Sequence, residues 1–181
     1  MFRIVIVFLV LAGCGYPERE EVSLKESAFS HALEIDADED LRPYLFEVLT
    51  RCESLPNARR DECYKNVKKL TVIKYVDDMS EVTPNEDAVG LCKKSATNAK
   101  IYIKTDVEDK EGLRMRNIMW HEIGHCVLSY DHVEDRPHIM SPSVLSEKYL
   151  GENWSDLANH FFTDTNIPNF SLTSESWSDQ Y

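Results

Sequence analysis

The stretch HEIGHCVLSYDH, residues 121–132, places two histidines four residues apart in a segment without proline. The sequence from Leu113 to Leu128 predicts a long helix. Residues four apart share one face of a helix, so His121 and His125 can direct their imidazoles to one ion at about 2 Å. Glu122 is adjacent and can reach a metal-bound water without itself binding the metal. The spacing therefore predicts a metal site with two histidine ligands and a glutamate base.

Two further features indicate close packing around this helix. Gly124 lies inside it, where glycine costs about 1 kcal/mol relative to alanine, so we expect another segment to approach closely there. Downstream, the stretch HIMSP (residues 138–142) places Ile139-Met140 in a tight, proline-containing segment. This segment resembles the Met-turn of the metzincin zinc peptidases, in which a methionine forms an apolar floor beneath the metal histidines.

The third ligand departs from the metzincin signature H-E-x-x-H-x-x-G-x-x-H. At the signature's glycine and final histidine this chain has Leu128 and Asp131. A smaller subgroup of the family uses aspartate there, which makes Asp131 a candidate. Alternatively, the helix runs one residue further and Ser129 takes the turn, because a β-carbon disfavours the left-handed conformation that glycine supplies. We favour His132, since imidazole is the commoner catalytic zinc ligand, and keep Asp131 and His138 as alternatives.

The resemblance implies a zinc-dependent endopeptidase with an α+β, zincin-like fold, in which a small mixed sheet packs against the active-site helix between N-terminal and C-terminal helices. Zinc would be held by His121, His125 and His132, and Glu122 would take a proton from the attacking water. Two alternatives use the same residues: a binding lipoprotein with a structural or vestigial zinc site, and a non-peptide metallohydrolase such as an amidase. We expect a monomer that acts on a protein or peptide substrate.

The remaining sequence predicts the elements around this helix. Alternating β-branched residues predict strands at Leu70–Val76 and Ala99–Thr105, with a short edge strand near Ala88–Cys92. Apolar residues at helical spacing predict helices over Asp38–Glu53 and Glu152–Phe162. This order favours an α+β arrangement over repeated βαβ units.

Four cysteines outside the N-terminal segment allow three disulfide connectivities. Cys52 and Cys63 are nearest in sequence and flank a turn-like proline-asparagine pair, which favours their pairing and leaves Cys92 with Cys126. Secreted bacterial metzincin-like proteins with HExGHC helices and an upstream GLC are similar to the GLCKKS and HEIGHC stretches here. That resemblance implies a disulfide that clips a loop to the metal-site helix. Four buried free thiols are the alternative.

The N-terminal segment MFRIVIVFLVLAGC has the length and flanks of a secretory signal peptide and is too short to span a bilayer. Its last four residues resemble a bacterial lipobox, which implies lipid attachment at Cys14. An ordinary signal peptide cleaved near Ala12 is the alternative. We expect a signal peptide over residues 1–13, a flexible tether over 14–30 and one catalytic domain over 31–181, held at the bacterial cell envelope.

The charge of the chain narrows its range of partners. It has 20 Lys and Arg against 32 Asp and Glu, a formal net charge of −12 at pH 7. Proteins that bind nucleic acid or anionic lipid through charge need clustered Lys and Arg, and this sequence has no polybasic stretch. We therefore expect no nucleic-acid partner, and membrane attachment through the lipid on Cys14 alone.

Overall fold

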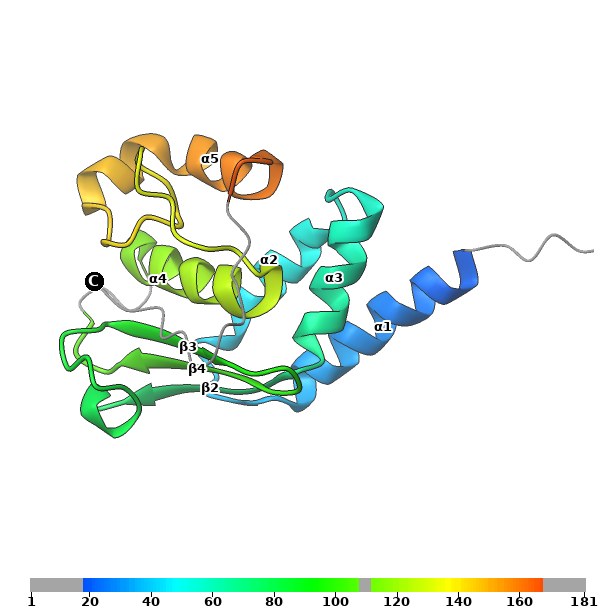
Figure 1. Cartoon of the computed structure of the whole chain (residues 1–181), viewed down its shortest axis with the longest axis horizontal. Coiled ribbons are helices and arrows are strands. Elements are labelled where there is room, and N and C mark those ends of the chain that lie inside the picture. Colours follow the sequence, from blue (N-terminus) through cyan, green and yellow to red (C-terminus); the bar gives the residue numbers. More distant parts are fainter. Residues whose placement is uncertain (1–17, 108–111, 168–181) are drawn as a thin grey trace, which may run out of the picture.

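The computed structural model describes residues 18–107 and 112–167, which form an α+β fold with a four-stranded mixed sheet and five α-helices. Helix α4 (Leu113–Ile123) packs over the sheet, and α5 (Glu147–Thr163) covers the other side of α4 (Figure 1). Eight of the eleven residues of α4 are buried, including every residue from Asn117 to Ile123. This burial follows from the position of the helix in the middle of three layers, which leaves little of its C-terminal half facing water.

The sheet has the strand order β1-β2-β4-β3. Strands β1 (Asp36–Ala37), β2 (Leu70–Val76) and β4 (Ala99–Lys104) run parallel, and β3 (Gly90–Lys94) pairs antiparallel with β4 as an edge strand. The predicted strands β2 and β4 are confirmed, and the edge strand lies two residues later than expected. Alternate residues of β4 are buried, as expected of a sheet with helices on one face.

Helix α2 (Arg42–Cys52) confirms the helix expected over residues 38–53. Pro43 lies in its first turn, where a missing backbone N–H breaks no intrahelical bond. The apolar residues at helical spacing are fully buried in the core: Leu41, Leu45, Val48 and Leu49. Burial of this stripe accounts for the helix.

Helix α1 (Glu18–Glu34) corrects the expectation of a flexible tether over residues 14–30, because the chain is helical from Glu18 onward. Its contact with the core depends largely on small residues, with Ala28 and Ala32 fully buried. Alanines do not produce a recognisable apolar stripe, and the helix was missed for that reason. Residues 1–17, with the predicted signal peptide and Cys14, lie outside the described part.

Helix α3 (Asn57–Val67) was not predicted either. Its sequence is highly charged, yet Cys63, Tyr64, Asn66 and Val67 are buried at its C-terminal end. The disulfide from this helix to α2 holds it against the core. Among the described residues, no helix has the length and apolar character needed to cross a membrane.

Helix α5 confirms the predicted C-terminal helix and begins five residues earlier than expected. Ser146 caps its first turn by accepting a hydrogen bond from the backbone N–H of Tyr149. Aromatic rings join α5 to α4, with the ring centroid of Trp120 lying 5.2 Å from Trp154 and 5.5 Å from Phe161. These contacts fix the outer helix on the helix that carries the histidines.

Both predicted disulfides are confirmed. Cys52–Cys63 joins α2 to α3, and Cys92–Cys126 joins the edge strand β3 to the turn that continues α4. The second bond links segments 34 residues apart in sequence, against 11 for the first. A disulfide that closes a longer loop removes more conformational freedom from the unfolded chain.

Replacing Cys92 and Cys126 together by alanine should lower the free energy of unfolding by about 4 kcal/mol, because the 34-residue loop is then unconstrained. The matched Cys52 and Cys63 double alanine variant should lose about 3 kcal/mol. Urea unfolding followed by tryptophan fluorescence measures both values. A protein unaffected by loss of the Cys92–Cys126 bond would contradict this role.

Candidate metal centre

The helix that carries the HEIGH segment changes form at Gly124. Helix α4 ends at Ile123 and continues as a single π-helical turn, η2 (Gly124–Leu128). The Gly124 carbonyl accepts the backbone N–H of Ser129 and, at 3.0 Å, that of Tyr130. A π turn takes one residue more than an α turn. The predicted one-residue extension of the helix is therefore confirmed.

Ser129 ends this turn in the left-handed conformation, with φ 58° and ψ 35°. It is the single non-glycine residue with positive φ in the described part of the chain. Leu128 stays in the π turn and is buried. The expectation that Ser129, and not residue 128, takes the turn is confirmed, and the chain then reverses toward His132.

The side chains of three histidines converge here: His121 from α4, His125 from the π turn and His132 from the segment after it. The Nε2 atoms of His121 and His125 are 2.8 Å apart, and His132 Nε2 lies 3.2 Å from His125 Nε2 and 3.3 Å from His121 Nε2. Ligand nitrogens about 2.05 Å from a tetrahedral metal lie about 3.3 Å from one another. Two edges of the triangle match this value and the third is slightly shorter. The cluster can hold a metal ion.

Backbone carbonyls set the tautomers of the two helical histidines. His121 Nδ1 donates to the Ile139 carbonyl at 2.8 Å, and His125 Nδ1 donates to the Tyr130 carbonyl at 2.6 Å. Because a carbonyl only accepts, each Nδ1 carries the proton and each Nε2 presents its lone pair to the centre of the cluster. This is the hydrogen-bonding pattern that orients histidines as metal ligands.

Burial keeps these imidazoles neutral. It lowers the pKa of His121 well below its ordinary value, and neighbouring His125 and His132 lower it further. Burial likewise lowers the pKa of His125 to about 3. Neutral imidazole is the form that binds a metal, so both ligands are ready without losing a proton to solvent.

The alternative third ligands lie elsewhere. Asp131 Oδ1 accepts the backbone N–H of His132 at 2.8 Å and so fixes the turn that presents this histidine. His138 Nδ1 accepts the backbone N–H of Met140 at 3.0 Å within the next loop. In the described residues no fourth His, Cys, Asp or Glu joins the cluster. The structure thus brings His132, the third ligand that we favoured, together with His121 and His125, which gives three protein donors.

Glu122 follows His121 on α4 and is fully buried. Its carboxylate approaches the first residue of β3, because a β-carbon at Gly90 would lie 2.7 Å from Glu122 Oε1. Any larger residue at Gly90 would therefore displace this carboxylate or the strand. The edge strand and the glutamate are adjacent.

Met140 packs closely against Gly124, the first residue of the π turn. A β-carbon at Gly124 would lie 2.5 Å from the Met140 sulfur and 3.1 Å from a ring carbon of Phe161. The close approach expected at Gly124 is thus confirmed. Met140 is fully buried, and the preceding residue, Ile139, supplies the carbonyl that orients His121.

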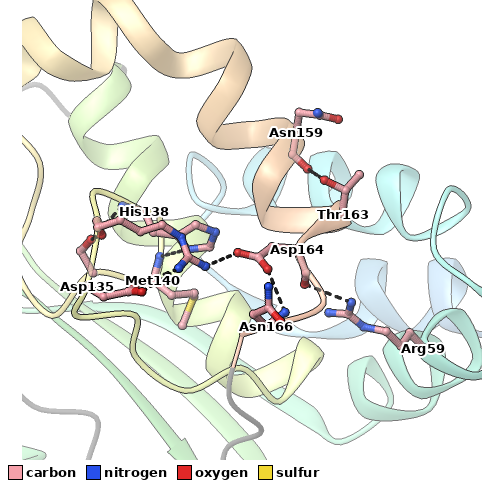
Figure 2. A network of polar contacts seen from close by, with 10 residues as sticks. Arg59, Asp135, His138, Met140, Asn159, Thr163, Asp164 and Asn166 are labelled. Carbon is pink, nitrogen blue, oxygen red and sulfur yellow. Dashed lines mark hydrogen bonds and ion pairs between the residues drawn. The ribbon is translucent and has the colours of Figure 1, made fainter.

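The loop over residues 133–142, which carries Met140, is held by contacts within itself and with neighbouring helices. The backbone N–H of Val133 donates to the Met140 carbonyl at 2.8 Å. Arg136 forms an ion pair with Asp164, the residue that follows α5 as its C-cap. Figure 2 shows Asp164 between this loop and Arg59. The Arg59 guanidinium donates one hydrogen bond to the Asp164 backbone carbonyl and another to the Tyr130 hydroxyl. The segments that supply both orienting carbonyls are thereby anchored to helices α3 and α5.

Two side chains at the site had no signal in the sequence. Asn66 on α3 and Lys94 on β3 both donate hydrogen bonds to Ser129 Oγ, at 3.2 and 2.9 Å. They are 63 and 35 residues from Ser129 in sequence and belong to no recognisable motif. Only the tertiary structure brings them to this turn.

A comparison of the chain with protein families, curated proteins and solved structures finds no match. The chemistry of the cluster is accordingly inferred from its own donors and distances. Three converging imidazoles, two of them held neutral by burial, form a site that can hold a metal ion. Imidazole nitrogen is a ligand of the borderline transition metals.

The packing of Met140 against the helix gives a direct test. Gly124→Ala should lower the free energy of unfolding by about 1–3 kcal/mol, because the new methyl group meets the Met140 sulfur. It should also weaken metal binding, since Ile139 beside Met140 orients His121. Chemical denaturation and metal titration measure the two effects.

Gly151→Ala is the matched control. A β-carbon there meets nothing within 4 Å, so alanine should raise stability by about 0.5–1 kcal/mol through helix propensity alone. Equal responses at the two glycines would contradict the close contact at Gly124.

Proposed function

We propose that the protein is a zinc-dependent endopeptidase with a zincin-like fold. The observation that carries the proposal is the triangle of Nε2 atoms, which offers three protein ligands and leaves a fourth metal position open. Catalytic zinc sites have this composition, whereas structural zinc sites are closed by four protein donors. The packing of Met140 against Gly124 and the position of Glu122 directly after His121 in the sequence support the same assignment.

Zinc bound by the three histidines would activate a water molecule and polarise the scissile carbonyl. His121 and His125 keep their lone pairs toward the ion because backbone carbonyls hold their Nδ1 protons. Glu122 accepts the proton of the attacking water on its carboxylate and delivers it to the leaving amine. The burial of Glu122 keeps this proton from bulk water between the two transfers.

The edge strand supports a peptide as the substrate. In the described part of the chain, β3 pairs with β4 on one side alone, and it begins at Gly90 against Glu122. An extended peptide can add to such an edge through backbone hydrogen bonds. A peptide bound there would run past the glutamate, which favours peptide hydrolysis over the amidase alternative.

The binding-protein alternative requires a closed or unused zinc site. Asp131, the acidic residue nearest to His132 in sequence, is directed to the backbone N–H of His132. The open coordination position therefore favours catalysis over a structural role. Attachment to the cell envelope through Cys14 stays a prediction from the N-terminal sequence.

Glu122→Gln tests the proposal. It keeps the size of the side chain and removes the base, so proteolysis of an unfolded protein substrate should fall by at least about a hundredfold while Zn²⁺ stays bound. Glu134→Gln, at an exposed position, is the matched control and should retain activity. Full activity in the Glu122 variant would overturn the mechanism, and zinc-loaded wild-type protein that cleaves no peptide would overturn the function.

A further inference from the structure

We propose that Asn66 and Lys94 act as positioning residues for the metal centre. Their hydrogen bonds hold Ser129 in a left-handed conformation and so fix where His132 meets the other two histidines. We call these three residues, Asn66, Lys94 and Ser129, the Ser129 clasp. The inference rests on the metal centre alone and does not require that the site hydrolyse peptides.

Ser129 needs outside support for its conformation. A β-carbon in the left-handed region lies too close to the backbone, and helix ends commonly use glycine there for that reason. Serine has no such freedom, yet Ser129 has φ 58°. Non-glycine residues stay in this region when their surroundings over-determine them. Side chains from β3 and α3 donate hydrogen bonds to the Ser129 hydroxyl and to the backbone carbonyls of His125 and Val127.

Lys94 approaches from the edge strand β3. Its ammonium donates to Ser129 Oγ at 2.9 Å and to the His125 carbonyl at 3.4 Å. The second contact places a cation on the carbonyls at the end of the helical segment, where positive charge is favourable. Lys94 is thus joined at once to the turn residue and to a residue that binds the metal.

Asn66 approaches from the opposite element, α3. Its side-chain nitrogen donates to the Val127 carbonyl at 3.0 Å and to Ser129 Oγ at 3.2 Å. The side chain is buried, with 6% of the residue exposed, so both amide protons are placed on fixed acceptors. Two lone pairs on the serine oxygen are therefore used by two donors from different parts of the fold.

The position of Ser129 explains why this matters for the metal. It lies between His125, four residues earlier, and His132, three residues later. The next residue, Tyr130, supplies the carbonyl that orients His125. If Ser129 relaxed to an ordinary backbone conformation, the chain after it would turn elsewhere, and His132 would leave the triangle. The clasp thus couples the strand and α3 to the third ligand.

The test compares substitutions that separate the β-carbon from the hydroxyl, with Zn²⁺ affinity measured by chelator competition. Ser129→Ala loses the hydroxyl and keeps the β-carbon, so affinity should fall by about tenfold or more. Ser129→Gly loses both and should bind Zn²⁺ nearly as well as the wild type. Lys94→Met keeps the apolar stem and should weaken binding by a similar factor, while Lys93→Met on the exposed neighbour should not.

Rescue distinguishes positioning from general stabilisation. Adding Ser129→Gly to Lys94→Met should restore most of the lost Zn²⁺ affinity, because glycine adopts the turn without help. Asn66→Leu should behave like Lys94→Met, and if it fails to fold the lysine variants still decide the question. Equal affinities for Ser129→Ala and wild type, or no rescue by glycine, would overturn the proposal.

The same titration separates this inference from the proposed function. A protein that binds Zn²⁺ with these differences but cleaves no peptide would support the clasp and refute the peptidase. A wild-type protein that binds no Zn²⁺ would overturn both.

Discussion

Two backbone carbonyls, those of Tyr130 and Ile139, determine what this site can be. By accepting the Nδ1 protons of His125 and His121, they direct two lone pairs at each other across 2.8 Å inside the protein. Facing lone pairs in a buried place are unfavourable unless a cation lies between them. The surrounding loops, helices and edge strand hold these two carbonyls and the imidazole of His132 in place.

Each of these groups depends on a different part of the fold. The Ile139 carbonyl comes from the loop packed under Gly124, and that loop is tied to α5 through Asp164. The Tyr130 carbonyl follows the π turn, which the Cys92–Cys126 disulfide joins to the sheet. The candidate metal centre is thus assembled from several separate segments of the chain. Its geometry is maintained by packing and covalent closure and not by one helix alone.

The sequence was most informative where the chemistry is local. The spacing of His121 and His125 on a helix, the turn at Ser129 and both disulfides follow from local geometry, turn chemistry or the family resemblance, and the structure agrees with each. Helix α1 was missed because buried alanines leave no apolar stripe, and α3 because its charged face dominates its composition. The donors to Ser129 could not be predicted, since their role exists only once β3, α3 and the turn have come together.

The most direct test of the central claim is the Zn²⁺ content of purified wild-type protein compared with His132→Ala and Asp131→Ala. Three histidine ligands predict one Zn²⁺ per wild-type chain, loss of the ion in His132→Ala, and a bound ion in Asp131→Ala, which keeps all three imidazoles. An ion lost from Asp131→Ala but retained by His132→Ala would contradict the account.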